Sequence, residues 1–186
     1  IAVANTTAAT EPRLEYMIAK LPRFPFDKFT SAVNDLGTQM KATGEVMGIG
    51  STIEECLLKG IRSLEVGVNH IYASKFDHMG KEELMEYISH FRDDNIYAIA
   101  ELFSHNATVE EIHAVTQITP FFLEAIKRIV DMETTLKNNV RDLDTLWVAK
   151  KMGFSDKYIA RMWGCEELEV YDFRKENGVF PAFRMV

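Results

Sequence analysis

Residues 37–67 read GTQMKATGEVMGIG followed by STIEECLLKGIRSLEVG, and the change between these two halves decides the fold. In the second half, Ser51 and Glu54 fit a capping box, in which a hydroxyl and a carboxylate satisfy free amides at a helix start. Apolar residues then recur at three- and four-residue steps: Ile53, Leu57, Ile61, Leu64 and Val68. This spacing predicts a helix of about four turns with one buried face.

The first half and the residues before it lack this helical periodicity. Between residues 1 and 50, prolines and glycines interrupt short apolar runs. The run LEYMIAKLPRF at 14–24 predicts a strand that Pro22 and Pro25 end, since proline lacks the amide hydrogen of a sheet ladder. This part has little core of its own, so we expect it to pack poorly. We place a domain boundary after Gly50, between residues 1–50 and residues 51–186.

Helical patterns continue almost without a break after residue 51. Thr108 and Glu111 form a second capping box, and Pro120 opens the longest predicted helix, where its missing amide hydrogen is tolerated. Further helices are expected at 82–91, 93–106, 143–153, 155–164 and 165–178, and glycine or Asn-Gly ends the last three. The sequence therefore predicts a mainly α fold: a compact helical domain from about Ser51 to Asn177, preceded by a strand-containing remnant.

Composition limits the class of protein. The 186 residues are 47% hydrophobic, enough for one domain with a core, or for a domain plus a fragment. The apolar runs fall far short of the ~18 residues of a membrane helix, and no signal peptide is recognisable. Cys56 and Cys165 form no disulfide framework, which favours a cytoplasmic setting. The net charge of −7 argues against nucleic acid. Because the chain starts at Ile1, we expect it to be part of a longer polypeptide.

No catalytic, cofactor-binding or metal-binding residue is predicted. Histidines at positions 70, 78, 90, 105 and 113 lack zinc-site spacing, and we expect them to be surface or partly buried residues. Cys165 follows Gly164 near a helix start, where the helix dipole could lower a thiol pKa. No base is identifiable near it, so a small residue in a capping region is the favoured interpretation.

The run VAKKMGFSDKYIARMWGCEELEV at 148–170 has the helix, glycine turn and helix of a DNA-reading motif. Its helices and the residues after them carry acids that would repel phosphate: Asp156, Glu166, Glu167, Glu169 and Asp172. Compact packing of three helices is favoured over DNA binding. A freestanding helical interaction module or a helix-turn-helix DNA-binding module remains the alternative function.

The glycine-rich string GEVMGIG at 44–50 is neither a Walker loop nor a dinucleotide fingerprint. Two longer stretches closely resemble the large subunit of carbamoyl phosphate synthetase: TTAATEPRLEYMIAKLPRFPFDKF at 6–29 and LGTQMKATGEVMGIGSTIEECLLKGIRSLEVG at 36–67. Each of that family's two ATP-grasp halves ends in a variant of Gly-Glu-Val-Met. The passage into a helical region resembles the first half running into the oligomerisation domain. Two later stretches are also similar to that family: KKMGFSDKYIA at 150–160 resembles the oligomerisation domain, and ENGVFPAFRMV at 176–186 resembles the segment that leads from it toward the second half. Residues 68–144 are assigned to the domain by their position between these stretches.

The resemblance implies that residues 37–50 close the carboxyphosphate-forming ATP-grasp domain, with glycines at turns and close backbone contacts. Lys41 and Glu45 are then structural. In that family ATP, Mg²⁺ or Mn²⁺ and bicarbonate bind upstream, so this fragment alone is expected to be inactive and without cofactors. The full enzyme would be a ligase that makes carbamoyl phosphate from bicarbonate, glutamine-derived ammonia and two ATP, for arginine and pyrimidine synthesis. Its implied partners are a glutaminase small subunit and further large subunits, with no nucleic acid or membrane.

The helix around Ile96 to Phe103 is expected to contribute to the surface through which the domain self-associates. Ile96, Ala100 and Phe103 form one stripe, whereas Tyr97, Ile99 and Leu102 project elsewhere. The alternative is that this is the central helix of the bundle, surrounded by its neighbours. The following run PFFLEAIKRIV at 120–130 adds more large apolar residues than one small core readily hides.

Overall fold

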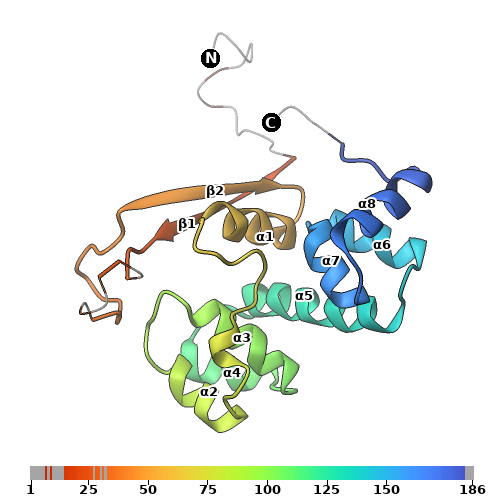
Figure 1. The fold of residues 1–186 in the computed structure, drawn as a ribbon. Coiled ribbons are helices and arrows are strands. Elements are labelled where there is room, and N and C mark those ends of the chain that lie inside the picture. Colours follow the sequence, from red (N-terminus) through yellow and green to blue (C-terminus); the bar gives the residue numbers. More distant parts are fainter. Residues whose placement is uncertain are drawn as a thin grey trace.

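The computed structural model describes residues 7, 9, 15–26, 28, 29, 31 and 33–182. Within these residues, a two-stranded sheet is followed by eight α-helices, with a short 3-10 helix η1 (Ser74–Phe76) after the first (Figure 1). The predicted mainly α fold with a strand-containing N-terminal part is confirmed. The predicted strand start at Leu14 and the last four residues of the chain lie outside the described residues.

The N-terminal part is a β-hairpin. Strand β1 (Met17–Arg23) pairs antiparallel with β2 (Gly44–Gly50), so that Met17 lies opposite Gly50 and Arg23 opposite Gly44. Pro22 does not end the strand as expected, because β1 continues to Arg23. In a two-stranded sheet each strand has one unpaired edge, and a residue without an amide hydrogen is tolerated there.

The hairpin packs closely on helix α1 (Ile53–Ser63), so the expectation of poor packing is wrong. A Cβ on Gly48 would lie 2.0 Å from the carbonyl oxygen of Cys56, which means that the strand and helix backbones touch there. Leu21 of β1 occupies the space beside Gly60, where a Cβ would lie 2.4 Å from its Cδ1. The predicted close backbone approach of the glycines is confirmed at Gly48.

Helix α1 begins one residue later than predicted. Thr52 is the N-cap, and its hydroxyl accepts a hydrogen bond from the amide of Glu55 at 3.2 Å. The sequence STIEE fits the capping pattern in two registers, Ser51 with Glu54 and Thr52 with Glu55. The second register leaves Glu54 to accept a hydrogen bond from Nε of Arg128, in helix α5 (Pro120–Asn138), at 2.5 Å.

The buried face of α1 also differs from the predicted stripe. The helix has 11 residues, and Val68 lies beyond its end. Its fully buried apolar side chains are Cys56, Leu58 and Ile61. The hairpin and α5 both pack on α1, so the helix is covered on more than one side and a single stripe does not describe its burial.

Helices α2 (Lys81–Ile88), α3 (Asn95–Ser104) and α4 (Val109–Thr116) form a cluster below α1 (Figure 1). Helix α2 ends three residues before Phe91, which was expected to belong to it and is 68% exposed. The predicted capping box of Thr108 and Glu111 is confirmed at the start of α4.

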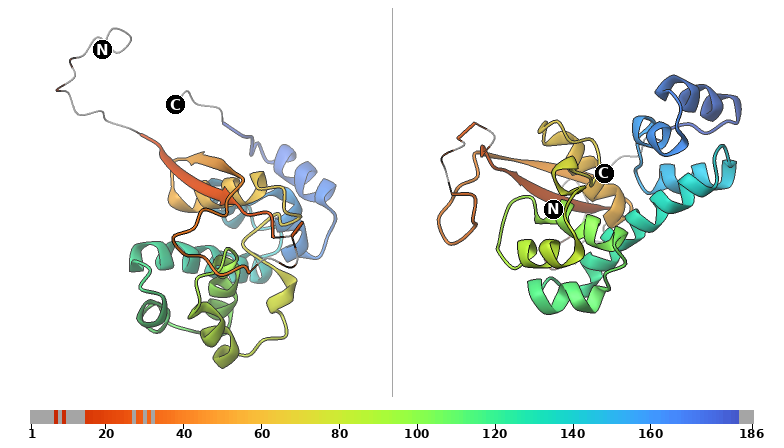
Figure 2. Two further views of the ribbon diagram at one scale, coloured as in Figure 1. Left: turned by 90° about the vertical axis from the view of Figure 1, so that its left-hand side faces the viewer. Right: turned by 60° about the horizontal axis from the view of Figure 1, so that its bottom comes forward.

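Helix α5 runs from the cluster of α2, α3 and α4 to the last three helices of the chain, as the views in Figure 2 show. It contacts α1, α3 and α4, and also α6 (Leu143–Lys151) and α7 (Asp156–Trp163), while α8 (Glu167–Glu176) packs on α7. Pro120 opens α5 as predicted, and Gly164 ends α7 with a φ of 68°. One apolar core follows α5 through the helical part, with Leu123, Ile129 and Leu136 of α5 fully buried.

Candidate association surface

Helix α3 is the central helix of its cluster and does not face solvent. Tyr97 is 9% exposed and Leu102 is 0% exposed, and Ile99 and Phe103 are buried as well. The expectation that this helix contributes to an association surface is wrong, and the alternative of a helix surrounded by its neighbours is confirmed. A helix that is apolar on every face is stable only where every face is covered.

The turn between α4 and α5 directs the next apolar segment outward. Gln117 ends α4 in the left-handed conformation with a φ of 58°. Nδ1 of His113 lies 2.7 Å from the carbonyl oxygen of Ile118, a hydrogen bond that closes the turn. Thr119 then caps α5, and Pro120 occupies the first turn with its backbone already suited to the helix.

The first turn of α5 carries two adjacent aromatic side chains on its outer side. Phe121 is 50% exposed and Phe122 is 47% exposed, and their rings meet edge to face with centroids 5.3 Å apart. Val115, in the last turn of α4, is also exposed. We call Val115, Pro120, Phe121 and Phe122 the α4–α5 corner.

Helix α5 does not need these aromatic side chains for its own packing. Its inner face is supplied by Leu123, Ile126, Ile129 and Val130, all buried. Complete burial of an aromatic side chain removes about 150–250 Å² of surface from water, and a partner that covered these half-exposed rings would remove about half of that for each. Contiguous aromatic surface of this kind is typical of protein association sites.

Lys41, in the loop between the strands, and Glu45, in β2, both make structural contacts. Nζ of Lys41 donates hydrogen bonds to the carbonyl oxygens of Val33 at 2.9 Å and Asp35 at 2.6 Å. Glu45 pairs across the sheet with Lys20 at 2.8 Å. Gly37 lies in a bend between the two strands, but neither Gly37 nor Gly44 has the positive φ that favours glycine.

Most of the histidines lie at or near the surface, as predicted, but His70 is an exception. It is 2% exposed, and its Nε2 lies 3.1 Å from Oε1 of Glu133 in α5. Its ring stacks on Tyr158 of α7 with centroids 3.5 Å apart. Among the described residues, no group of three or more His, Cys, Asp or Glu side chains is arranged to hold a metal ion.

Neither cysteine has the surroundings of a reactive thiol. Burial raises the pKa of Cys165, and the negative charge of Glu169 raises it further. Burial likewise raises the pKa of Cys56, whose Sγ donates to the carbonyl oxygen of Met17 at 3.1 Å. Helix α8 begins two residues after Cys165, so the possible helix-start effect on that thiol does not apply.

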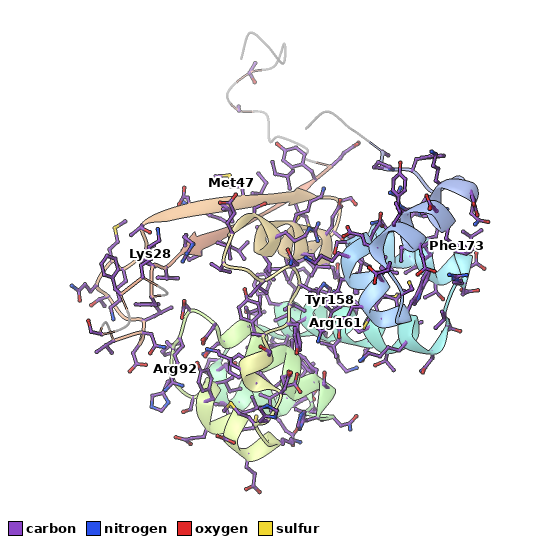
Figure 3. All side chains as sticks on the ribbon, viewed as in Figure 1. Lys28, Met47, Arg92, Tyr158, Arg161 and Phe173 are labelled. Atoms are coloured by element: carbon purple, nitrogen blue, oxygen red, sulfur yellow. The ribbon has the colours of Figure 1, made fainter. Side chains whose placement is uncertain are left out.

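The last three helices are joined by a partly buried ion cluster. Asp156 Oδ1 lies 2.8 Å from Nζ of Lys150, and its Oδ2 lies 3.0 Å from Nη2 of Arg174. Burial alone raises the pKa of Asp156, but these two cations hold it below its ordinary value. Asp156 thus links α6, α7 and α8 and is not a free acid on a reading helix. Helix α8 packs on α7 while α6 and α7 both pack on α5, so the three helices are compact but share α5, and Phe173 of α8, labelled in Figure 3, adds an edge contact to Trp163.

Each helix in the described part of the chain is too short or too polar to cross a membrane. Residues 45–178 match the family model described as carbamoyl-phosphate synthetase large chain, oligomerisation domain. The match begins inside β2 and ends two residues after α8, so it covers the whole helical part together with the strand that packs on α1. The chain therefore belongs to the carbamoyl-phosphate synthetase large-chain family and contains its oligomerisation domain.

Proposed function

We propose that this chain joins copies of a carbamoyl phosphate synthetase large chain, and that the α4–α5 corner is the contact surface. The match to an oligomerisation domain over residues 45–178 carries the proposal. The half-exposed pair Phe121 and Phe122 supports the choice of surface, because about half of each side chain is open to solvent. Burying them against a second copy would release water from both aromatic faces.

In the wider proposal, the chain also connects the two synthetic halves of a cytoplasmic, glutamine-dependent ligase. That enzyme would combine bicarbonate, glutamine-derived ammonia and two ATP into carbamoyl phosphate, for arginine and pyrimidine synthesis. A glutaminase small subunit would supply the ammonia. ATP and Mg²⁺ or Mn²⁺ would bind elsewhere on the large chain, so we expect residues 1–186 alone to neither bind nor hydrolyse ATP.

Sedimentation velocity of the chain at rising concentration tests the association surface. We expect the wild-type chain to associate and Phe121→Glu to remain monomeric, because a charge would have to lose its water at the contact. Phe91→Glu is the matched control, since Phe91 is exposed but lies outside the corner. Circular dichroism of each variant checks that the helices are retained.

Two results would contradict the proposal. One is a wild-type chain that stays monomeric at high micromolar concentration. The other is equal association of wild type and Phe121→Glu, which would place the contact on a different surface.

A further inference from the structure

A pocket of about 460 Å³ lies between the segment that follows α1 and the outer side of α7. Residues 67–70 and 72–75 form one wall, and Lys157, Tyr158 and Arg161 form the other. Figure 3 shows Tyr158 and Arg161 in the middle of the molecule, where α7 approaches α5 and the segment after α1. The pocket therefore lies where distant parts of the sequence meet.

The charge of this pocket is opposite to that of the chain. Its charged side chains are the cations Lys75, Lys157 and Arg161, and no carboxylate lines it, whereas the chain carries a net charge of −7. Lys75 is paired with Asp94. In the part of the chain that the structure describes, Lys157 and Arg161 form no salt bridge, although the Asp77 carboxylate is near enough to Arg161 to raise its pKa.

Arg161 is held in place by aromatic rings. Its guanidinium carbon lies 4.0 Å from the ring centroid of Tyr72 and 5.9 Å from that of Tyr158. Tyr72 is itself fixed, because its hydroxyl donates to Asp77 at 2.6 Å. A hydrogen bond with Tyr72 raises the pKa of Arg161 and keeps it charged, and its remaining N–H groups have the planar arrangement that matches carboxylate and phosphate oxygens.

The pocket wall contains a buried polar atom whose hydrogen-bonding capacity is unused. His70 lines the pocket, and its Nε2 is engaged by Glu133, but its Nδ1 has no partner. Because Nε2 donates to the Glu133 carboxylate, Nδ1 of the neutral ring is an acceptor, so the O–H of a monoprotonated phosphate could donate to it whereas an ionised carboxylate could not. Within the described chain, the amides of residues 67–73 also donate no backbone hydrogen bond.

We propose that this pocket binds a small oxyanion, a phosphate or carboxylate group, which Arg161 and Lys157 bind from α7 while residues 67–73 supply amide donors. Bidentate hydrogen bonds from a guanidinium are among the strongest that a protein offers to such groups. A bound anion would connect the segment after α1 to α7 and so stabilise the helical domain. The proposal is independent of the α4–α5 corner, and either can fail without the other.

The test titrates the whole chain with inorganic phosphate and, separately, with acetate at constant ionic strength. The ¹⁵N chemical shift of the His70 imidazole reports on the pocket, and calorimetry gives the affinity. We compare wild type with the double variant Lys157→Gln, Arg161→Gln. The matched control is Lys137→Gln, Lys151→Gln, which changes the net charge equally at exposed positions outside the pocket.

We expect a saturable shift at His70 with at least one anion, and the stronger binder identifies the ligand chemistry as phosphate or carboxylate. The pocket variant should bind at least about tenfold more weakly, a change of ~1.4 kcal/mol, and the control should bind like wild type. Equal weakening in both variants would show a general charge effect and overturn the proposal. So would the absence of a saturable shift with either anion.

Discussion

Two apolar segments of this chain lie in opposite surroundings. Helix α3 is apolar on several faces and is largely enclosed by its neighbours, with Leu102 fully buried. Helix α5 begins with two aromatic residues of similar hydrophobicity, yet Phe121 and Phe122 are about half exposed. The difference teaches that the amount of apolar surface does not locate an association site. What matters is whether the apolar residue lies on the face that its helix turns toward the core.

The largest expected effect comes from placing a charge inside α3. Leu102→Glu would bury a carboxylate without a partner among Leu58, Leu123 and other core residues. We expect it to destabilise the fold by more than about 4 kcal/mol, enough to unfold most of the chain at room temperature. Urea unfolding followed by circular dichroism measures this effect.

The matched change Phe121→Glu should alter the free energy of unfolding by about 0.5 kcal/mol or less, because the side chain is already half hydrated. If Leu102→Glu remained folded with wild-type stability, or if Phe121→Glu unfolded the chain, the comparison between α3 and the start of α5 would be wrong.

A second comparison contrasts two glycines of β2, one in contact with α1 and one with free space around it. Gly48→Ala would bring a Cβ within 2.0 Å of the Cys56 carbonyl oxygen, so β2 must move away from α1. Gly44→Ala is the control, since no atom lies within 4 Å of its Cβ position. We expect Gly48→Ala to cost about 1–3 kcal/mol of stability, as overpacking typically does. Equal urea midpoints for the two variants would show that the hairpin is not held closely on α1.

A third and smaller effect follows from the buried His70. Burial lowers its pKa; the hydrogen bond that His70 donates to the Glu133 carboxylate opposes this, and the positive charges of Arg62 and Arg161 add to the lowering. The folded state therefore favours the neutral ring. Stability is fully present above the unfolded histidine pKa of about 6.5 and is lost as the pH falls from there through the folded pKa.

His70→Gln removes this titration, so its stability should change less than that of wild type between about pH 7.5 and about pH 5.5. For one proton the difference in slope cannot exceed about 1.4 kcal/mol per pH unit. Chemical unfolding at each pH gives the comparison. Parallel profiles for the two proteins would mean that His70 does not titrate with folding in this range.

Short sequence patterns predicted the start of a helix correctly where only one alignment of the pattern was possible. The capping box of Thr108 and Glu111 and the first-turn position of Pro120 both needed no information from elsewhere in the chain. The start of α1 was ambiguous, because adjacent hydroxyls and adjacent acids allow two capping registers. In the second register Glu54 is left to pair with Arg128 of α5. The position of Arg128 cannot be predicted from the sequence around the start of α1.

The candidate sites depended on distant partners and were harder to predict. His70 looked like an ordinary surface histidine, because its hydrogen-bond partner Glu133 is 63 residues away in sequence. The periodicity of α3 showed that it is apolar on several faces but not that its neighbours cover all of them. For α5, the sequence indicated surplus apolar residues, but only the direction of its first turn shows that Phe121 and Phe122 are the exposed ones.

Hydroxyl-radical footprinting at rising chain concentration tests the central claim, association through the α4–α5 corner, most directly. Oxidation of Phe121 and Phe122 reports their solvent contact, Phe91 is the exposed reference, and Phe103 is the buried one. We predict that oxidation of Phe121 and Phe122 falls as the chain associates, while oxidation of Phe91 stays high and that of Phe103 stays low. Association without any protection of Phe121 and Phe122 would contradict the account.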